Sequence, residues 1–237
     1  MKQFRVLYAL ILRSIATRGR IAALGALGLL GVVVGSAISA DTARDGAQFV
    51  NLFGLTVTVP LTTLVFASAS LGDIIDDGTM VYLWLRPVPR HRIVGAAAAA
   101  TLTVVTPLVL APLVVAAALT GAGADVVVGA ALAALFGVIA YTGLFVMLGV
   151  RVRRSLVWGL LYIFIWEGFV ANAGKTASRL AVRAYTRSIL SDVALSPPLK
   201  PLRLATISPF YSYVIPAFVF LLALAYATRR MQHQDVA

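Results

Sequence analysis

The chain has 237 residues, of which 60% are hydrophobic and only 12% are charged, and its formal net charge is +11. Soluble domains use about half apolar and a quarter charged residues, so this composition excludes an ordinary water-soluble fold and predicts an all-α, polytopic membrane protein. Cysteine is absent and histidine occurs only at His91 and His233, so disulfides and the usual zinc and iron–sulfur sites lack their ligands.

Residues 1–20 predict a helix that lies along the membrane surface. Apolar side chains recur there every three or four positions, and basic side chains gather on another face. The alternative is a basic flank that only sets the topology of the first membrane span. The apolar residues are Phe4, Leu7, Ile11 and Ile15, and the basic residues are Lys2, Arg5, Arg13 and Arg20.

Six apolar runs come next, each near the length of about 20 residues with which a helix crosses a bilayer. They predict six membrane-spanning helices in a single domain, 1–237, and the first is interpreted as a retained helix rather than a cleaved signal peptide. The runs are 21–40, 49–71, 93–119, 126–150, 156–172 and 213–228. Pro107 and Pro112 predict a bend in the third run, either a simple kink or a gating hinge.

Residues 72–92 join the second and third runs and carry three kinds of residue in order: acids, an apolar stretch, and arginines around a proline turn. The acids suit the N-terminal end of a short helix that begins near Gly78. Its apolar surface is larger than a connector in water should show, so a partner is expected to cover it. The acids are Asp73, Asp76 and Asp77, the apolar residues include Met80, Leu83 and Trp84, and the arginines are Arg86, Arg90 and Arg92.

Glu167 is the one acid inside a predicted span, apart from residues at the boundaries. A charged acid in the middle of a bilayer costs about 2.5 to 3.5 kcal/mol on insertion scales, so such a residue usually faces a protein interior or water. One hypothesis places Glu167 on a transport pathway. The other places it near the outer interface, where it pairs with Lys175 or Arg179.

Residues 173–212 predict a long outer loop, with a helix followed by a proline-rich hairpin. Arg179, Arg183 and Arg187 are spaced four residues apart, which predicts a basic stripe on one face of that helix. The stripe is interpreted either as a solvated face resting on the outer leaflet or as a surface that attracts anionic lipids or an anionic substrate.

The distribution of lysine and arginine predicts that both termini are cytoplasmic, because thirteen of these residues then lie inside and seven outside. Basic residues that flank apolar runs favour contact with membrane lipids rather than with nucleic acid. Arginine outnumbers lysine and alanine is abundant, which is typical of GC-rich bacterial genomes. The expected location is therefore a bacterial plasma membrane.

The connector resembles the cytoplasmic turn of type-2 ATP-binding cassette (ABC) transporter permeases, where an acidic stretch precedes Gly-Thr, an apolar helix, Pro-Val-Ser-Arg and Gly-Lys. The chain departs from this pattern at Ile74, Pro89 and Ala96, where the family has glutamate, serine and lysine. The layout of a surface helix, six spans and a long last outer loop is also similar. The matching residues are Gly78, Thr79, Leu83, Pro87, Val88, Arg90 and Gly95.

The resemblance implies a permease subunit of an ABC exporter. Two permease chains, as a homodimer or a heterodimer, would form the pathway, and a separate ATP-binding subunit would carry ATP and Mg²⁺ and dock on residues 72–92. The chain has no phosphate-binding Gly-Lys-Ser/Thr loop, so no cofactor is expected on it and it is not predicted to be an enzyme. The implied coupling residues are Asp73, Asp76, Asp77, Gly78, Thr79, Met80, Leu83, Trp84, Pro87 and Arg90.

Two other functions fit a polytopic membrane protein. A membrane-embedded enzyme would need a nucleophile or metal motif, and neither Gly-x-Ser-x-Gly nor His-Glu-x-x-His occurs in the chain. A secondary transporter driven by an ion gradient would use intramembrane acids and inverted repeats, and Glu167 alone offers limited support for one. Copurification of an ATPase separates the exporter from both.

Overall fold

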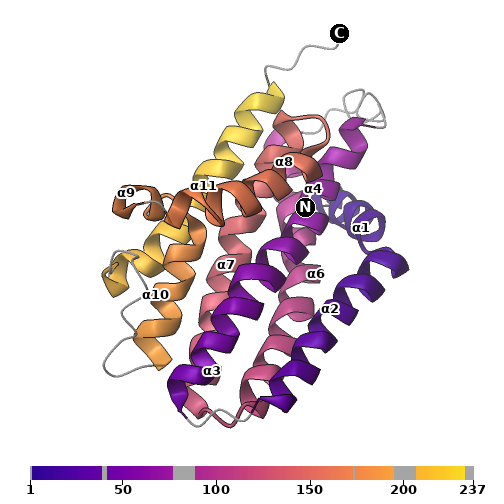
Figure 1. Ribbon diagram of the computed structural model, residues 1–237. Coiled ribbons are helices and arrows are strands. Elements are labelled where there is room, and N and C mark those ends of the chain that lie inside the picture. The colour runs from indigo at the N-terminus through magenta and orange to yellow at the C-terminus, as the bar shows by residue number, and fades with distance from the viewer. Residues whose placement is uncertain (1, 39–41, 77–88, 173, 195–206, 233–237) are drawn as a thin grey trace.

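The computed structural model describes residues 2–38, 42–76, 89–172, 174–194 and 207–232 (Figure 1). All regular structure in these ranges is helical, which confirms the predicted fold class. Five helical runs within them are long and apolar enough to cross a membrane. They are α2 (Arg18–Ala37), α6 (Arg90–Leu119), α7 (Ala124–Arg151), α11 (Pro209–Gln232), and the continuous run of α3 (Ala43–Phe49), η1 (Val50–Thr58) and α4 (Val59–Asp76).

The predicted run 156–172 is the exception. Its apolar helix, α8 (Ser155–Leu161) continued by η2 (Tyr162–Glu167), has 13 residues and is about 20 Å long, which is less than a bilayer core. The chain turns at Gly168, before the predicted end at residue 172, because an apolar composition does not by itself maintain a helix. Three short helices follow: η3 (Val170–Asn172), α9 (Lys175–Ser178) and α10 (Val182–Ala194).

The N-terminal helix α1 spans Lys2–Ile15 and packs on α6 and α4. Leu7, Ile11 and Ile15 from the predicted apolar stripe are buried in the protein core. The helix ends before Thr17, whose extended backbone and side-chain oxygen cap the start of α2 by accepting a bond from the Arg20 N–H at 3.4 Å. The predicted helix is therefore present, and neighbouring helices cover its apolar stripe except at Phe4, which is exposed.

Helix α7 lies at the centre of the bundle and contacts α4, α6, α10 and α11. Two of its largest side chains, Tyr141 and Phe145, are fully buried. Glycines on its surface let the neighbouring helices approach closely, as small residues do in membrane bundles. A β-carbon placed on Gly143, for instance, would lie 2.7 Å from the Cα of Phe220 in α11.

Helix α6 is continuous from Arg90 to Leu119 and contains both prolines of the predicted bend. Pro112 packs against α2, where a β-carbon on Gly28 would lie 2.8 Å from the proline Cγ. This proline therefore has a packing role at a close helix contact. A gating role for either proline stays a prediction.

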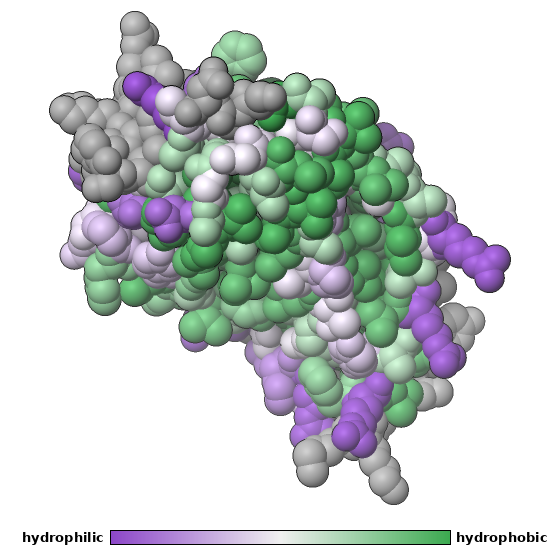
Figure 2. Space-filling model, turned by 90° about the horizontal axis from the view of Figure 1, so that it is seen from below, coloured by the Kyte–Doolittle hydropathy of each residue, from purple (hydrophilic) through white to green (hydrophobic). Residues whose placement is uncertain are grey.

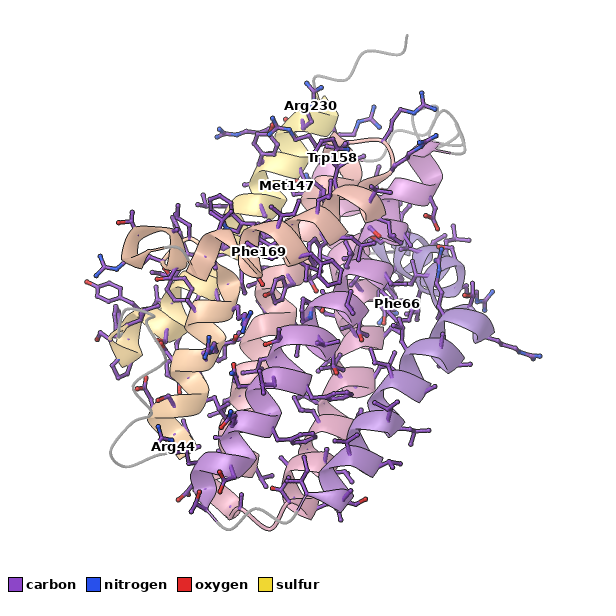
Figure 3. All side chains as sticks on the ribbon, in the orientation of Figure 1. Arg44, Phe66, Met147, Trp158, Phe169 and Arg230 are labelled. Atoms are coloured by element: carbon purple, nitrogen blue, oxygen red, sulfur yellow. The ribbon has the colours of Figure 1, made fainter. Side chains whose placement is uncertain are left out.

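Arginines gather at the end of the bundle that carries α1 and the C-terminal end of α11. Figure 3 places Arg230 at this end and Arg44 at the opposite one. Between the two ends, the helices expose many large hydrophobic side chains, as expected for a surface that faces lipid. In Figure 2, which views the molecule from below, hydrophobic side chains cover much of the visible surface. The gathered arginines include Arg18 and Arg20 of α2, Arg90 and Arg92 of α6, Arg151 of α7, and Arg229 and Arg230 of α11.

Candidate functional site

Two short helices lie one after the other along α7, and the first is α8 with η2. The Tyr162 ring lies edge-on to the Phe145 ring, with 6.3 Å between the ring centroids. One turn further along α7, the Tyr141 hydroxyl donates a hydrogen bond to the carboxylate of Glu167. This first helix therefore follows α7 away from the arginine-rich end and stops beside Tyr141.

The second helix, α10, continues in the same direction along α7. A β-carbon on Gly137 would lie 3.1 Å from the Cγ2 of Thr186, and one on Gly129 would lie 3.2 Å from the Cδ1 of Leu190. The contacts with α7 thus move steadily toward its N-terminal end as the chain advances through α8, η2 and α10. Figure 1 shows the same order, with α8 above α10 beside α7. The two helices form one path along α7 that is broken between η2 and α10.

The position of the break follows from the length of α7. Tyr141 lies ten residues before Arg151 and seventeen after Ala124, which is about 15 Å from one end of α7 and about 26 Å from the other. With α7 crossing a hydrocarbon core of about 30 Å, Glu167 and the break lie well inside that core. Backbone that is not helical is tolerated at such depth only when protein or a water-filled cavity surrounds it.

Glu167 is 3% exposed and its carboxylate has several donors. The Tyr141 hydroxyl and the Tyr162 hydroxyl, the latter at 3.2 Å, both donate to it. The backbone of Arg183 supplies a further hydrogen bond, and the charge of Arg183 lies close enough to stabilise the carboxylate. These partners come from α7, η2 and α10, so Glu167 joins the two halves of the broken path. Whether it also lines a pathway stays a prediction.

The predicted stripe of three arginines on one helical face is wrong. Helix α10 begins at Val182, so Arg179 lies in the turn that precedes it. The Tyr185 hydroxyl donates to the Arg179 carbonyl oxygen at 2.5 Å and holds this turn. Arg183 and Arg187 remain on α10 but are half-buried, and within the described part of the chain the Nε of Arg183 has no hydrogen-bond acceptor.

A cavity of about 410 Å³ opens beside the break. Its volume is in the range of pockets that hold small ligands. Of the described residues that line it, only Arg179 is charged. The lining includes Leu144 of α7, Tyr162 and Trp166 of η2, Arg179, and Ile215 and Val219 of α11.

Both the path containing η2 and the continuous run α3–η1–α4 contain a π-helical segment. In η1 the extra residue per turn leaves carbonyls that side chains occupy: the Thr56 hydroxyl donates to the Asn51 carbonyl at 2.7 Å and the Thr58 hydroxyl to the Phe53 carbonyl at 3.0 Å. Segment η1 contacts α10 and α7, so it lies beside the second half of the broken path. Such segments occur frequently at functional sites.

The structure places only part of the predicted coupling segment. The Asp73 carboxylate pairs with the Arg20 guanidinium at 2.7 Å, and Arg90 begins α6. Asp76 ends α4, so the residue that was expected to lead a new helix closes the preceding one. The remaining residues lie outside the described ranges, and their coupling role stays a prediction. They are Asp77, Gly78, Thr79, Met80, Leu83, Trp84 and Pro87.

Tyr141, Tyr162 and Trp166 did not enter the sequence prediction. Each lies in an apolar run, where a hydroxyl or indole N–H needs a polar partner once it is buried. This need for a polar partner is the signal that could have pointed to them. In the sequence, Glu167 is the acid nearest to Tyr162 and to Trp166. The pairing with Tyr141 could not be derived, because it depends on how η2 packs against α7.

No protein-family model, curated protein or solved structure matches the chain.

Proposed function

We propose that the chain is the membrane-spanning permease subunit of an ATP-driven ABC exporter. Two such subunits, identical or different, form the pathway in a bacterial plasma membrane, and a separate subunit binds ATP and Mg²⁺. The ATP-binding subunit docks on residues 72–92 and drives the change between inward-open and outward-open states. The sequence resemblance of this connector to type-2 permeases supports the proposal, and the surroundings of the connector support it further.

The observation that carries the proposal is that the N-terminal segment holds both ends of the connector. Where the connector leaves α4, Asp73 pairs with Arg20 at 2.7 Å. Where it enters α6, the Arg92 guanidinium donates to the Gln3 side-chain oxygen at 3.1 Å. Helix α1 also packs on both α4 and α6. A force applied to the connector therefore reaches α1, α2, α4 and α6 together.

The broken path supplies the sixth crossing in this proposal. The helical part before the break, Ser155–Glu167, and α10 after it each contain 13 residues, or about 20 Å of helix. Together they provide about 40 Å of helix, more than the roughly 30 Å of a bilayer core, so the path is long enough to cross it. Six crossings put both termini on one side, and the arginines at that end favour the cytoplasm. Helix α1 then lies at the inner membrane surface.

A pulldown tests the proposal. We expect the tagged chain, expressed with its neighbouring genes and purified in detergent, to retain an ATPase subunit. The variant Asp76→Arg, Asp77→Arg, Leu83→Arg should lose that subunit or its coupling, because charge and apolar surface on the connector both change. Asp125→Arg is the matched control, since Asp125 is an exposed acid in the first turn of α7 at the other end of the bundle. If the unaltered chain retains no ATP-binding partner in the pulldown, the exporter proposal is wrong.

Transport driven by an ion gradient is the second candidate, and the buried Glu167 favours it. Secondary transporters bind ions and substrates near the middle of the bilayer at discontinuous helices. If no ATPase copurifies, uptake into proteoliposomes that carry a proton gradient should depend on Glu167 and be lost in Glu167→Gln. Retention of that uptake in the variant would contradict the second candidate.

A further inference from the structure

We propose that the cavity beside the break binds an anionic amphiphile, whose negative group pairs with Arg179 and whose apolar part lies against α7, η2 and α11. The inference needs only that the helices span the bilayer. It does not depend on an ATP-binding partner, so the two proposals fail separately.

The lining of the cavity determines which chemistry it accepts. Leu144, Trp166, Ile215 and Val219 present aliphatic and aromatic surface from three different elements. The Tyr162 hydroxyl is already directed to Glu167 at 3.2 Å, so this polar group does not require a ligand. A polar or strongly hydrated molecule would lose its water here without replacement bonds, whereas an apolar chain or ring would be accommodated.

Arg179 determines the charge of the ligand. It lies in the turn between α9 and α10, which the bond from Tyr185 to its carbonyl holds in place, and its side chain is exposed. The cavity reaches Leu144, seven residues before Arg151 and therefore roughly 10 Å along α7 from the arginine-rich end. Arg179 lines the same cavity, and a guanidinium inside a bilayer is costly without a counter-charge or water. An anion at the cavity provides both charge compensation and bidentate hydrogen bonding.

The neighbourhood of the cavity gives an amphiphile a route from the membrane. Leu180, next to Arg179, is 66% exposed, and Phe169 of the break is 80% exposed. Phe218 of α11, one residue before the lining residue Val219, is 56% exposed. In Figure 3 Phe169 lies between Arg230 at one end of the bundle and Arg44 at the other. A molecule dissolved in the bilayer therefore meets apolar side chains at the edge of the cavity.

Tryptophan fluorescence tests the proposal directly. The chain has three tryptophans, so Trp84→Phe with Trp158→Phe leaves Trp166 in the cavity wall as the only one. We expect saturable quenching by 9,10-dibromostearate in detergent and much less by its uncharged methyl ester. In this background Arg179→Gln should lower the affinity for dibromostearate by about tenfold, or about 1.4 kcal/mol, because the charge pair is lost. Arg44 is an exposed arginine at the opposite end of the bundle, so Arg44→Gln should leave that affinity unchanged.

Two further variants separate binding from partition into the micelle. With Trp84→Phe and Trp166→Phe, the remaining Trp158 is 54% exposed and outside the cavity, so the acid and the ester should quench it equally. Val219→Phe fills the cavity and should abolish saturable quenching of Trp166 while thermal unfolding still shows a folded protein. Equal quenching of Trp166 by acid and ester, or no effect of Arg179→Gln in a folded variant, would overturn the proposal.

Nanodiscs identify the source of the ligand. Quenching of Trp166 by brominated phosphatidylglycerol, beyond that by brominated phosphatidylcholine, assigns the site to an anionic membrane lipid. Quenching by dibromostearate alone, with no preference between the two lipids, assigns it to a free amphiphile that the protein carries. Both outcomes support the binding of an anion at Arg179. Equal quenching by the two lipids, together with equal quenching by the acid and the ester, would contradict it.

Discussion

Helix α2 and the broken path along α7 cross the same bundle in opposite ways. Helix α2 is one uninterrupted helix of 20 residues, and much of its surface is exposed, including Leu29, Leu30 and Val33. It touches the bundle through glycines. The path through α8, η2 and α10 is interrupted, packs along the central helix α7, and holds Glu167 and Arg183 at its break.

The difference shows what a continuous helix provides in lipid. Helix α2 satisfies its backbone hydrogen bonds within itself, so it needs its neighbours only for close packing. The broken path leaves backbone groups unsatisfied at its two inner ends and depends on side chains from other elements to replace them. We therefore expect the broken path to be destabilised most by substitutions that remove polar contacts. Helix α2 should be destabilised most by substitutions that add bulk at its close contacts.

The largest effect is expected from Glu167→Ala. It leaves the hydroxyls of Tyr141 and Tyr162 without their acceptor and the charge of Arg183 without its nearby carboxylate, at a cost of about 3 kcal/mol. Thermal unfolding of the purified protein in detergent measures the loss. Glu167→Gln keeps an acceptor for the tyrosines and should cost clearly less. Equal melting of the alanine and glutamine variants would show that the carboxylate is not the link between the two halves.

The next effect is expected from Tyr141→Phe. This change removes one donor to a buried carboxylate without altering the packing of the ring, so it should cost about 1.5 kcal/mol. Tyr162→Phe removes the longer bond, at 3.2 Å, from a half-buried ring and should cost less. The same unfolding measurement compares them. A double variant that loses no more than Tyr141→Phe alone would indicate that the second bond contributes nothing.

On α2, the effect is expected to be steric. A β-carbon on Gly35 would lie 2.8 Å from the Ala116 carbonyl oxygen, which belongs to the backbone of α6 and cannot rotate away. Gly35→Ala should therefore destabilise the protein by about 1 kcal/mol. Gly25→Ala is the control, since its β-carbon would be 3.9 Å from the Leu108 side chain, and it should be neutral or slightly stabilising. Identical unfolding temperatures for both variants would contradict the close contact.

The smallest effect on stability is expected at the surface pair of Arg20 and Asp73. Its side chains are 31% and 53% exposed, so Asp73→Asn should cost about 0.5 kcal/mol and less at high salt. In the proposed exporter, however, this pair holds the connector. The same variant should therefore lower ATP-coupled transport more than it lowers stability, and proteoliposome assays at low and high salt would detect that difference. If Asp73→Asn leaves ATP-coupled transport unchanged, this pair does not transmit force from the connector.

The sequence by itself determined the fold class and the five helices that are long and apolar enough to cross a membrane. Long apolar runs are sufficient for this because a helix that meets lipid must satisfy its backbone internally, whatever its neighbours are. The amphipathic helix at the N-terminus was predictable from its apolar stripe for a similar reason. Residues such as Leu7 and Ile11 share one face through the geometry of the helix alone.

The tertiary structure alone decided the run 156–172 and the candidate site. Whether the chain continues as a helix or turns at Gly168 is not recorded in its composition. The turn follows Glu167, whose carboxylate receives hydrogen bonds from α7 and α10. The spacing of Arg179, Arg183 and Arg187 likewise predicted a single helical face, but the turn before Val182 separates the first from the others. Composition records which residues are apolar. It does not record which distant hydroxyl or backbone N–H will meet a buried carboxylate, and in the structure such contacts surround the break between η2 and α10.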